Sequence, residues 1–157
     1  MSRPAAIGRT PQWSETHMDT GHHLILFDGV CGLCTRLTRF VLPRDPGGIF
    51  HFASLQSPYG RAVLQQYGKN PDDLDTLVVV RDYATADARF LTKSQAALTV
   101  LETIGGIWRS VAVFRILPVS WLDRIYDVIA RYRYRVFGKH EICFMPSPEE
   151  RSRFLGL

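Results

Sequence analysis

The chain has 157 residues, of which 46% are hydrophobic and 22% are charged, a composition that excludes a disordered protein and suits one soluble globular domain. The formal charge of +4 is uneven, because seven basic residues stand against two acids between Ile107 and His140. We expect the basic residues of this last third to lie on a solvated helix surface. Such a surface could bind an anionic partner or a membrane surface, and we do not expect it to bind nucleic acid.

Residues 1–21 are polar, contain Pro and Gly, and show no periodicity, so we expect a poorly ordered tail. They hold no apolar run that could form the core of a signal peptide. The most apolar stretch, 107–122, is interrupted by Arg109, Arg115 and Pro118, which argues against a membrane span. We therefore expect a cytoplasmic protein, in a compartment where thiols stay reduced.

The first predicted strand is the short apolar run 23–27, which is too short for a helix. From Cys31 onward the pattern becomes helical and ends near Pro43. The apolar positions of this helix are Leu33, Leu37, Phe40 and Val41. A second strand is expected over 49–53.

Ser57 and Pro58 predict the start of a second helix, with serine as the N-cap and proline at the first helical position. Gly68 is the expected end of this helix. The β-branched run 76–80 predicts a central strand, and 88–91 predicts a weaker one.

A capping box over 92–95 predicts the start of a third helix that ends at Gly105 and Gly106. The order from 23 to 106 is strand-helix-strand-helix-strand-strand-helix, which indicates an α/β domain. The same order is found in the minimal thioredoxin or glutaredoxin core, whose redox cysteines lie in the turn from the first strand into the first helix.

The last third is predicted to form two helices, split near Pro118 and packed on the α/β core. A stripe at three- and four-residue spacing is the expected core-facing side of the second helix. The stripe consists of Leu122, Ile125, Ile129, Tyr132 and Val136. The predicted organisation is a tail (1–21), a redox core (22–106) and a C-terminal helical extension (107–157).

Cys31-Gly-Leu-Cys34 is the candidate catalytic motif, a dithiol at a helix N-terminus. A cysteine reacts as the thiolate, and the unpaired N–H groups and dipole of a helix N-terminus lower its pKa. We expect Cys31 to be exposed and to attack a disulfide, and Cys34, nearly one turn further on, to resolve the mixed disulfide. The alternative of two buried structural cysteines is weaker, because the pair lies at a strand-to-helix turn.

Asp28 lies three residues before the dithiol and has two candidate roles. It could accept or relay a thiol proton, most plausibly that of Cys34. It could instead shape the Asp-Gly turn by accepting hydrogen bonds from backbone N–H groups. Its negative charge would raise a nearby thiol pKa, so it does not activate Cys31 by charge.

A metal site is the main competing hypothesis. His140 and Cys143 lie at short spacing, and with Cys31 and Cys34 they could form a Cys₃His zinc site. Structural zinc ligands are usually closer together in sequence than these two pairs, which argues against this site. Cys143 is otherwise either a third redox thiol or a buried residue.

The run Asp28-Gly-Val-Cys31-Gly-Leu-Cys34 resembles the signature of the DCC family, a group of bacterial proteins described as thiol-disulfide oxidoreductases. The resemblance continues through 52–57, 77–80, 93–97 and 131–138 and covers about residues 24 to 155. It implies a thioredoxin-like fold and the three residues of the family name, matched here by Asp28, Cys31 and Cys34.

The sequence therefore predicts a thioredoxin/glutaredoxin-like core with a C-terminal helical extension. The predicted activity is that of a protein-disulfide reductase, with no bound cofactor. Its substrate would be a disulfide-containing protein or a small thiol compound, and its electron donor is not identified. The competing class is a non-enzymatic, zinc-stabilised binding module that uses Cys31, Cys34, His140 and Cys143.

Overall fold

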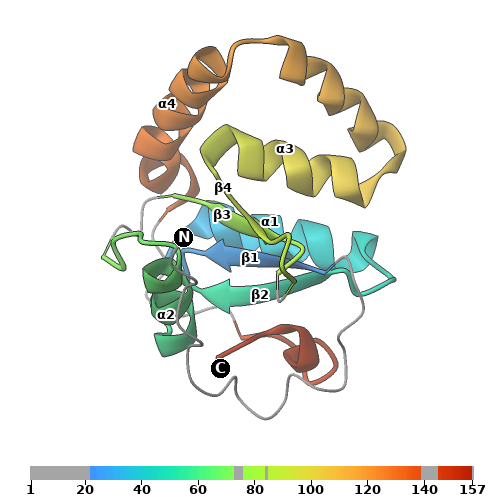
Figure 1. Cartoon of the computed structure of the whole chain (residues 1–157), viewed down its shortest axis with the longest axis vertical. Helices are drawn as coiled ribbons and strands as arrows, with labels where there is room; N and C mark the ends of the chain where they lie inside the picture. The colour runs from blue at the N-terminus through green and yellow to red at the C-terminus, as the bar shows by residue number, and fades with distance from the viewer. Residues whose placement is uncertain (1–21, 73–75, 84, 139–144, 157) are drawn as a thin grey trace, which may run out of the picture.

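The structure is a computed structural model of the chain and describes residues 22–72, 76–83, 85–138 and 145–156 (Figure 1). The predicted tail over 1–21 lies outside the described residues, as do His140 and Cys143. No helix among the described residues is long and apolar enough to span a membrane.

A four-stranded mixed sheet forms the centre of the molecule, with the strand order β2-β1-β3-β4. β1 (His23–Phe27) pairs in parallel with β2 (Phe50–Ser54) and antiparallel with β3 (Val78–Arg81). β4 (Arg89–Thr92) pairs antiparallel with β3 and forms the other edge. The buried positions of the first three strands are mostly apolar, and the three valines of β3 are also β-branched, which favours burial in a sheet.

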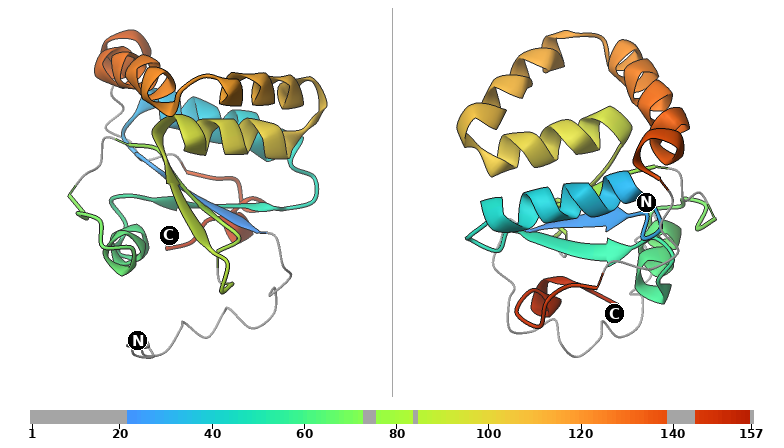
Figure 2. Two further views of the ribbon diagram at one scale, coloured as in Figure 1. Left: turned by 45° about the horizontal axis from the view of Figure 1, so that its top comes forward. Right: turned by 180° about the vertical axis from the view of Figure 1, so that it is seen from behind.

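Helices cover both faces of the sheet (Figure 2). α1 (Gly32–Val41) and α3 (Lys93–Ile104) pack with Ile25, Phe27 and Val79 on one face. α2 (Pro58–Gln66) packs with the alternate strand residues on the other face. Because side chains alternate along a strand, each strand serves both clusters. A short 3₁₀ helix, η1 (Leu42–Arg44), follows α1.

The predicted element order is confirmed, and the domain is α/β with a thioredoxin-like core. The Ser57 cap is also confirmed, because its hydroxyl oxygen accepts a hydrogen bond from the Gly60 N–H at 3.0 Å. The capping box over 92–95 is wrong, since the Thr92 side chain makes no cap hydrogen bond. Thr92 is the last residue of β4, paired with Val78, so the sheet fixes its conformation.

The last third begins with a 3₁₀ helix, η2 (Gly106–Ile116), followed after Pro118 by α4 (Val119–Phe137). The predicted split near Pro118 is confirmed. α4 packs against α3 and α1, on the same side of the sheet as both (Figure 2).

The predicted core-facing stripe of α4 is wrong. Ile125, Ile129, Tyr132 and Val136 are exposed, and Leu122 is half-buried. Polar contacts set the rotation of the helix instead. The Tyr126 hydroxyl accepts a hydrogen bond from the Leu77 N–H at 2.9 Å, and the buried Arg133 pairs with the buried Asp28. Both contacts turn inward the neighbouring face of α4, which carries Tyr126 and Arg133, and leave most of the predicted stripe exposed.

Residues 145–156 form no long helix and instead contact the outer edge of β2. Their one short helix is η3 (Arg151–Arg153). Phe154 bridges to Phe52, and its ring stacks on the Phe52 ring at 5.2 Å. Arg153 donates a 2.6 Å hydrogen bond to the buried carboxylate of Asp45. The end of the chain is therefore joined to the core by apolar and ionic contacts.

Candidate redox site at the start of helix α1

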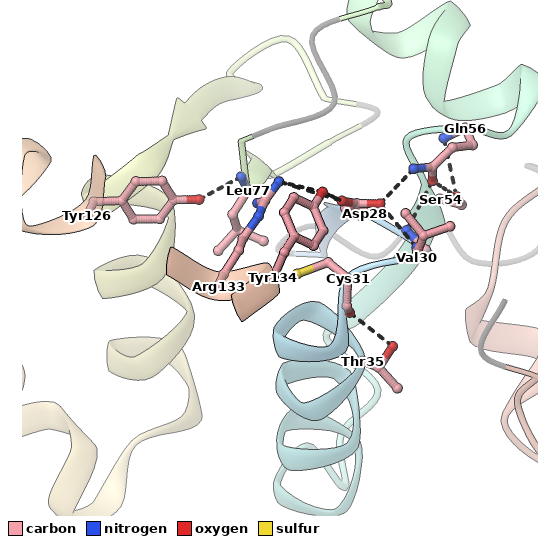
Figure 3. A network of polar contacts seen from close by, with 11 residues as sticks. Asp28, Val30, Cys31, Thr35, Ser54, Gln56, Leu77, Tyr126, Arg133 and Tyr134 are labelled. Carbon is pink, nitrogen blue, oxygen red and sulfur yellow. Dashed lines mark hydrogen bonds and ion pairs between the residues drawn. The ribbon is translucent and has the colours of Figure 1, made fainter. Parts of the chain in front are cut away.

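The two cysteines lie at the turn from β1 into α1, as the sequence predicts. Figure 3 shows Cys31 at the start of this helix. Cys31 is the N-cap residue of α1, and its N–H donates to the Asp28 carbonyl at 3.2 Å to close the turn. Cys34 is in the first turn of the helix. Both thiols are free, so the structure represents the reduced dithiol.

The expectation that Cys31 is exposed is wrong. Its exposed fraction is 0%, and that of Cys34 is 6%. The C-terminal end of α4 explains the burial, because Tyr134 packs against the cluster that contains both cysteines. The carbonyl of Gly138, which follows α4, also accepts a 3.3 Å hydrogen bond from the Gly32 N–H. A helix from the last third of the chain therefore covers the dithiol.

The two thiols have opposite pKa shifts. A hydrogen bond from Cys34 lowers the pKa of Cys31 to about 6, and the backbone of the first helical turn and the Arg133 charge act in the same direction, against burial. The same hydrogen bond, together with burial, raises the pKa of Cys34 well above its usual range. At neutral pH the pair therefore holds one thiolate on Cys31 and one proton on Cys34.

Arg133 supplies a buried positive charge next to the dithiol. Its side chain is 3% exposed, and one guanidinium nitrogen lies 3.6 Å from the Asp28 carboxylate. The same nitrogen donates a 3.0 Å hydrogen bond to the Tyr134 hydroxyl. Its charge lowers the pKa of both thiols, so it favours the thiolate form.

The Asp28 carboxylate joins the turn to α4 (Figure 3). One oxygen accepts from the Val30 N–H at 3.1 Å and from the Gln56 amide at 2.7 Å. The other oxygen accepts from the Tyr134 hydroxyl and faces Arg133. Among the described residues, none of these carboxylate contacts goes to a sulfur. The geometry thus matches the turn-forming role and adds a second one, the anchoring of α4.

Gln56 extends this network to the end of β2. Its side-chain oxygen accepts from the Gly29 N–H at 3.0 Å and from the Ser54 hydroxyl at 2.6 Å. Its amide nitrogen donates to Asp28. Gln56 therefore satisfies both the backbone of the Asp-Gly turn and the buried carboxylate, which fixes the loop that leads into Cys31.

The sequence did not identify four residues of this site, which are Gln56, Tyr126, Arg133 and Tyr134. Three of them lie in the segments 52–57 and 131–138, which carried the family resemblance, and this was the available signal. Hydrophobic periodicity assigned 132 and 136 to the core instead. The roles of the buried Arg133 and the half-buried Tyr134 depend on their contacts with Asp28, which is far away in the sequence.

The alternative zinc site is described only in part. Cys31 and Cys34 lie together, whereas His140 and Cys143 lie outside the described residues. Within the described residues, no three His, Cys, Asp or Glu side chains are grouped so that they could hold a metal ion. The Cys₃His site stays a prediction.

Comparison with known proteins gives a consistent result. The model of a family described as DCC1-like thiol-disulfide oxidoreductase matches residues 25–139. YuxK, an uncharacterized protein of Bacillus subtilis, is 39% identical over 134 residues, which cover 85% of this chain and 94% of YuxK. A chloroplastic DCC family protein of Arabidopsis thaliana is 33% identical over 121 residues, which cover 76% of this chain and 67% of that protein. No solved structure matches significantly.

Proposed function

The chain belongs to the DCC1-like thiol-disulfide oxidoreductase family, and from this premise we propose that it reduces disulfides by dithiol–disulfide exchange, with Cys31 as nucleophile and Cys34 as resolving thiol. The observation that carries the proposal is the opposite pKa shift of two adjacent thiols at a helix N-terminus. Such a pair holds a nucleophile and a proton-bearing partner at neutral pH.

The exchange takes two steps. The Cys31 thiolate attacks one sulfur of the substrate disulfide, forms a mixed disulfide, and releases the first substrate thiolate, which takes a proton from water. Cys34 then loses its proton and attacks the Cys31 sulfur, which releases the second substrate thiolate. The substrate gains two electrons, and the protein is left with a Cys31–Cys34 disulfide. A dithiol or dithiol protein as electron donor restores the reduced pair by the reverse exchange.

The first step itself favours the second. While Cys31 is a thiolate, its charge and its hydrogen bond from Cys34 hold the proton on Cys34. Formation of the mixed disulfide removes that charge, so the pKa of Cys34 falls toward its ordinary value. Cys34 then becomes a better nucleophile when the covalent intermediate exists.

We propose that Asp28 is a positioning residue. Its oxygens are bonded to Val30, Gln56 and Tyr134, which fixes the turn before Cys31 and the end of α4. Water that enters when the substrate binds would then accept the Cys34 proton.

A substrate can reach the Cys31 sulfur only if the residues that cover it move. Because Cys31 has no exposed surface, an attacking geometry with a substrate disulfide needs Tyr134 and the end of α4 to shift. The substrate class is a disulfide in a flexible protein segment or a small disulfide, since either can enter a narrow opening. A reducing compartment such as the cytoplasm would keep the dithiol ready for this reaction.

The test is covalent trapping in a Cys143→Ser background, which removes the third thiol. Cys34→Ser, incubated with oxidised glutathione, should accumulate a mixed disulfide at Cys31 that is visible by mass spectrometry. Cys31→Ser should trap little and should not reduce disulfides. Trapping only in Cys31→Ser would reverse the two roles, and trapping in neither variant would contradict the proposed reaction.

A further inference from the structure

The outer face of α4 is an apolar surface that nothing in the described part of the chain covers. We define it by Trp121, Ile125, Val128, Ile129, Tyr132 and Val136, all of them exposed. Trp121 is 63% exposed and Val136 is 71% exposed. η2 also exposes apolar side chains, among them Ile107 and Ile116, each 82% exposed. A row of large exposed apolar side chains along one helix face marks an interaction surface.

Helical spacing places a row of arginines along one border of this face. Arg124, Arg131 and Arg135 are exposed and follow one another at intervals of seven and four residues. At 3.6 residues per turn they form one row, next to the apolar stripe and away from the buried side that carries Tyr126. The exposed part of α4 therefore consists of an apolar stripe with a basic edge.

The two carboxylates of α4 both contact residues of α3. Asp123 accepts a 2.5 Å hydrogen bond from the Ser94 hydroxyl, and Asp127 lies 3.0 Å from the Lys93 ammonium. Both partners belong to the start of α3. Asp123 is half-buried there, whereas Asp127 is 56% exposed and stands four residues before Arg131, beside the arginine row and away from the apolar stripe. The described residues of the outer face and of its arginine row carry no negative charge.

We propose that the outer face of α4, together with η2, binds the surface of an anionic lipid bilayer. An apolar stripe with exposed tryptophan and tyrosine inserts at the level of the headgroups, and arginines along its edge contact the lipid phosphates. η2 and α4 are the outermost elements on their side of the sheet, so a flat surface can reach them (Figure 1). A second copy of the chain would meet these arginines with the same basic row, and its nearby Asp127 already pairs with Lys93.

Co-sedimentation with vesicles tests this proposal on the full chain. The wild-type protein should bind vesicles of phosphatidylcholine mixed with phosphatidylglycerol and bind vesicles of phosphatidylcholine alone much more weakly. High salt should weaken the binding, because it screens the arginines. A variant with Arg124→Gln, Arg131→Gln and Arg135→Gln should partition about 100-fold less onto the anionic vesicles.

Two further variants test whether vesicle binding depends on this face of the protein. Arg61→Gln, Lys69→Gln and Arg81→Gln together remove the same charge away from this face and should reduce partitioning by less than about tenfold. Trp121→Ser with Ile125→Ser should reduce it by at least about tenfold, because both side chains are exposed and would insert. Equal binding to neutral and anionic vesicles would overturn the proposal. So would a dimer, measured by analytical ultracentrifugation, that Trp121→Ser abolishes in a protein that binds no vesicles.

Discussion

The Tyr134 hydroxyl donates a hydrogen bond to the Asp28 carboxylate, and this contact joins the turn before the dithiol to the end of the helix that covers it. Burial raises the pKa of Tyr134, and the hydrogen bond to Asp28 adds to this effect, so the phenol stays a donor throughout the physiological range. Both residues hold the turn and the covering helix in place next to Cys31, and neither belongs to the reacting pair of thiols. The strength of this contact should therefore set how often the sulfur becomes accessible.

Tyr134→Phe should make Cys31 react faster with iodoacetamide while the ring still packs on the core. A hydrogen bond to a charged group contributes about 1.5–3 kcal/mol, so its loss should raise the open fraction and the labelling rate about tenfold or more. Tyr132→Phe is the matched control, since Tyr132 lies exposed on the same helix. Equal rates in Tyr134→Phe and in the wild type would show that this contact does not limit access.

The alkylation rate of Cys31 should rise with pH and reach half its maximum near pH 6, because only the thiolate reacts. Cys34 should stay unlabelled over the same range, since its pKa is raised. Cys34→Ala removes the largest cause of the Cys31 shift and should move the midpoint toward an ordinary thiol pKa. Peptide mapping by mass spectrometry distinguishes the two sites, and a midpoint that Cys34→Ala leaves in place would contradict this origin of the shift.

The same shift predicts a pH dependence of stability. The folded-state pKa of Cys31 lies below its unfolded value, so the thiolate stabilises the fold fully above about pH 9 and loses this effect as pH falls toward about 6. The free energy of unfolding of the reduced protein, measured in urea, should therefore increase relative to Cys31→Ser between these pH values. A difference that stays constant with pH would contradict a lowered thiol pKa. Cys34 acts in the opposite sense above pH 9, so the comparison ends there.

Arg133→Gln should raise the pKa of Cys31 and destabilise the protein, because it removes a positive charge from the dithiol and leaves Asp28 without its ionic partner. Removing one partner of a buried ion pair costs about 3 kcal/mol or more. Arg133→Lys keeps the charge and should retain most of the pKa shift. Arg131→Gln, on the exposed side of α4, is the control and should change neither quantity. Unfolding in urea and the alkylation midpoint measure the two effects.

Asp28→Asn distinguishes the positioning role from a proton relay. The amide keeps the acceptor for Val30 and Gln56, so the turn should form, while the contacts of the second oxygen with Tyr134 and Arg133 weaken. We expect release of the mixed disulfide, measured by stopped-flow, to change by less than about threefold. Loss of a general base would instead slow release by about 100-fold, and that result would restore the relay. Asp28→Ala should be less stable than Asp28→Asn.

Metal analysis separates the exchange reaction from the zinc-stabilised module. If Cys31 must remain a free thiolate, the purified reduced protein should carry no stoichiometric zinc, and a chelator should leave its melting temperature unchanged. One tightly bound zinc per chain that is lost in Cys143→Ser would favour the binding module.

The element order could be read from the sequence because each strand and helix carries its own local signal. Examples are the apolar run 23–27, the Ser57 cap and the break at Pro118. The rotation of α4 could not be read in this way. Periodicity shows that a helix has an apolar side, but the contacts that decide which side faces inward connect it with residues far away in the chain.

The residues of the candidate site show the same difference between local signals and long-range contacts. Cys31, Cys34 and Asp28 form a compact motif, and its position at a helix N-terminus follows from local pattern alone. Arg133 looks like any other arginine of a basic helix until Asp28 lies next to it. The burial of Cys31 follows from the docking of that helix, so a reading of the motif by itself predicted an exposed thiol.

The contact of residues 145–156 with β2 has a consequence for association between chains. β2 is an edge strand, and the open N–H and C=O groups of such an edge can pair with another molecule. The Leu155 N–H donates to the Phe52 carbonyl at 2.7 Å, and Phe154 occupies the adjacent position. Residues 154 and 155 therefore occupy part of the β2 edge, which leaves fewer of its backbone groups open to pairing with another molecule.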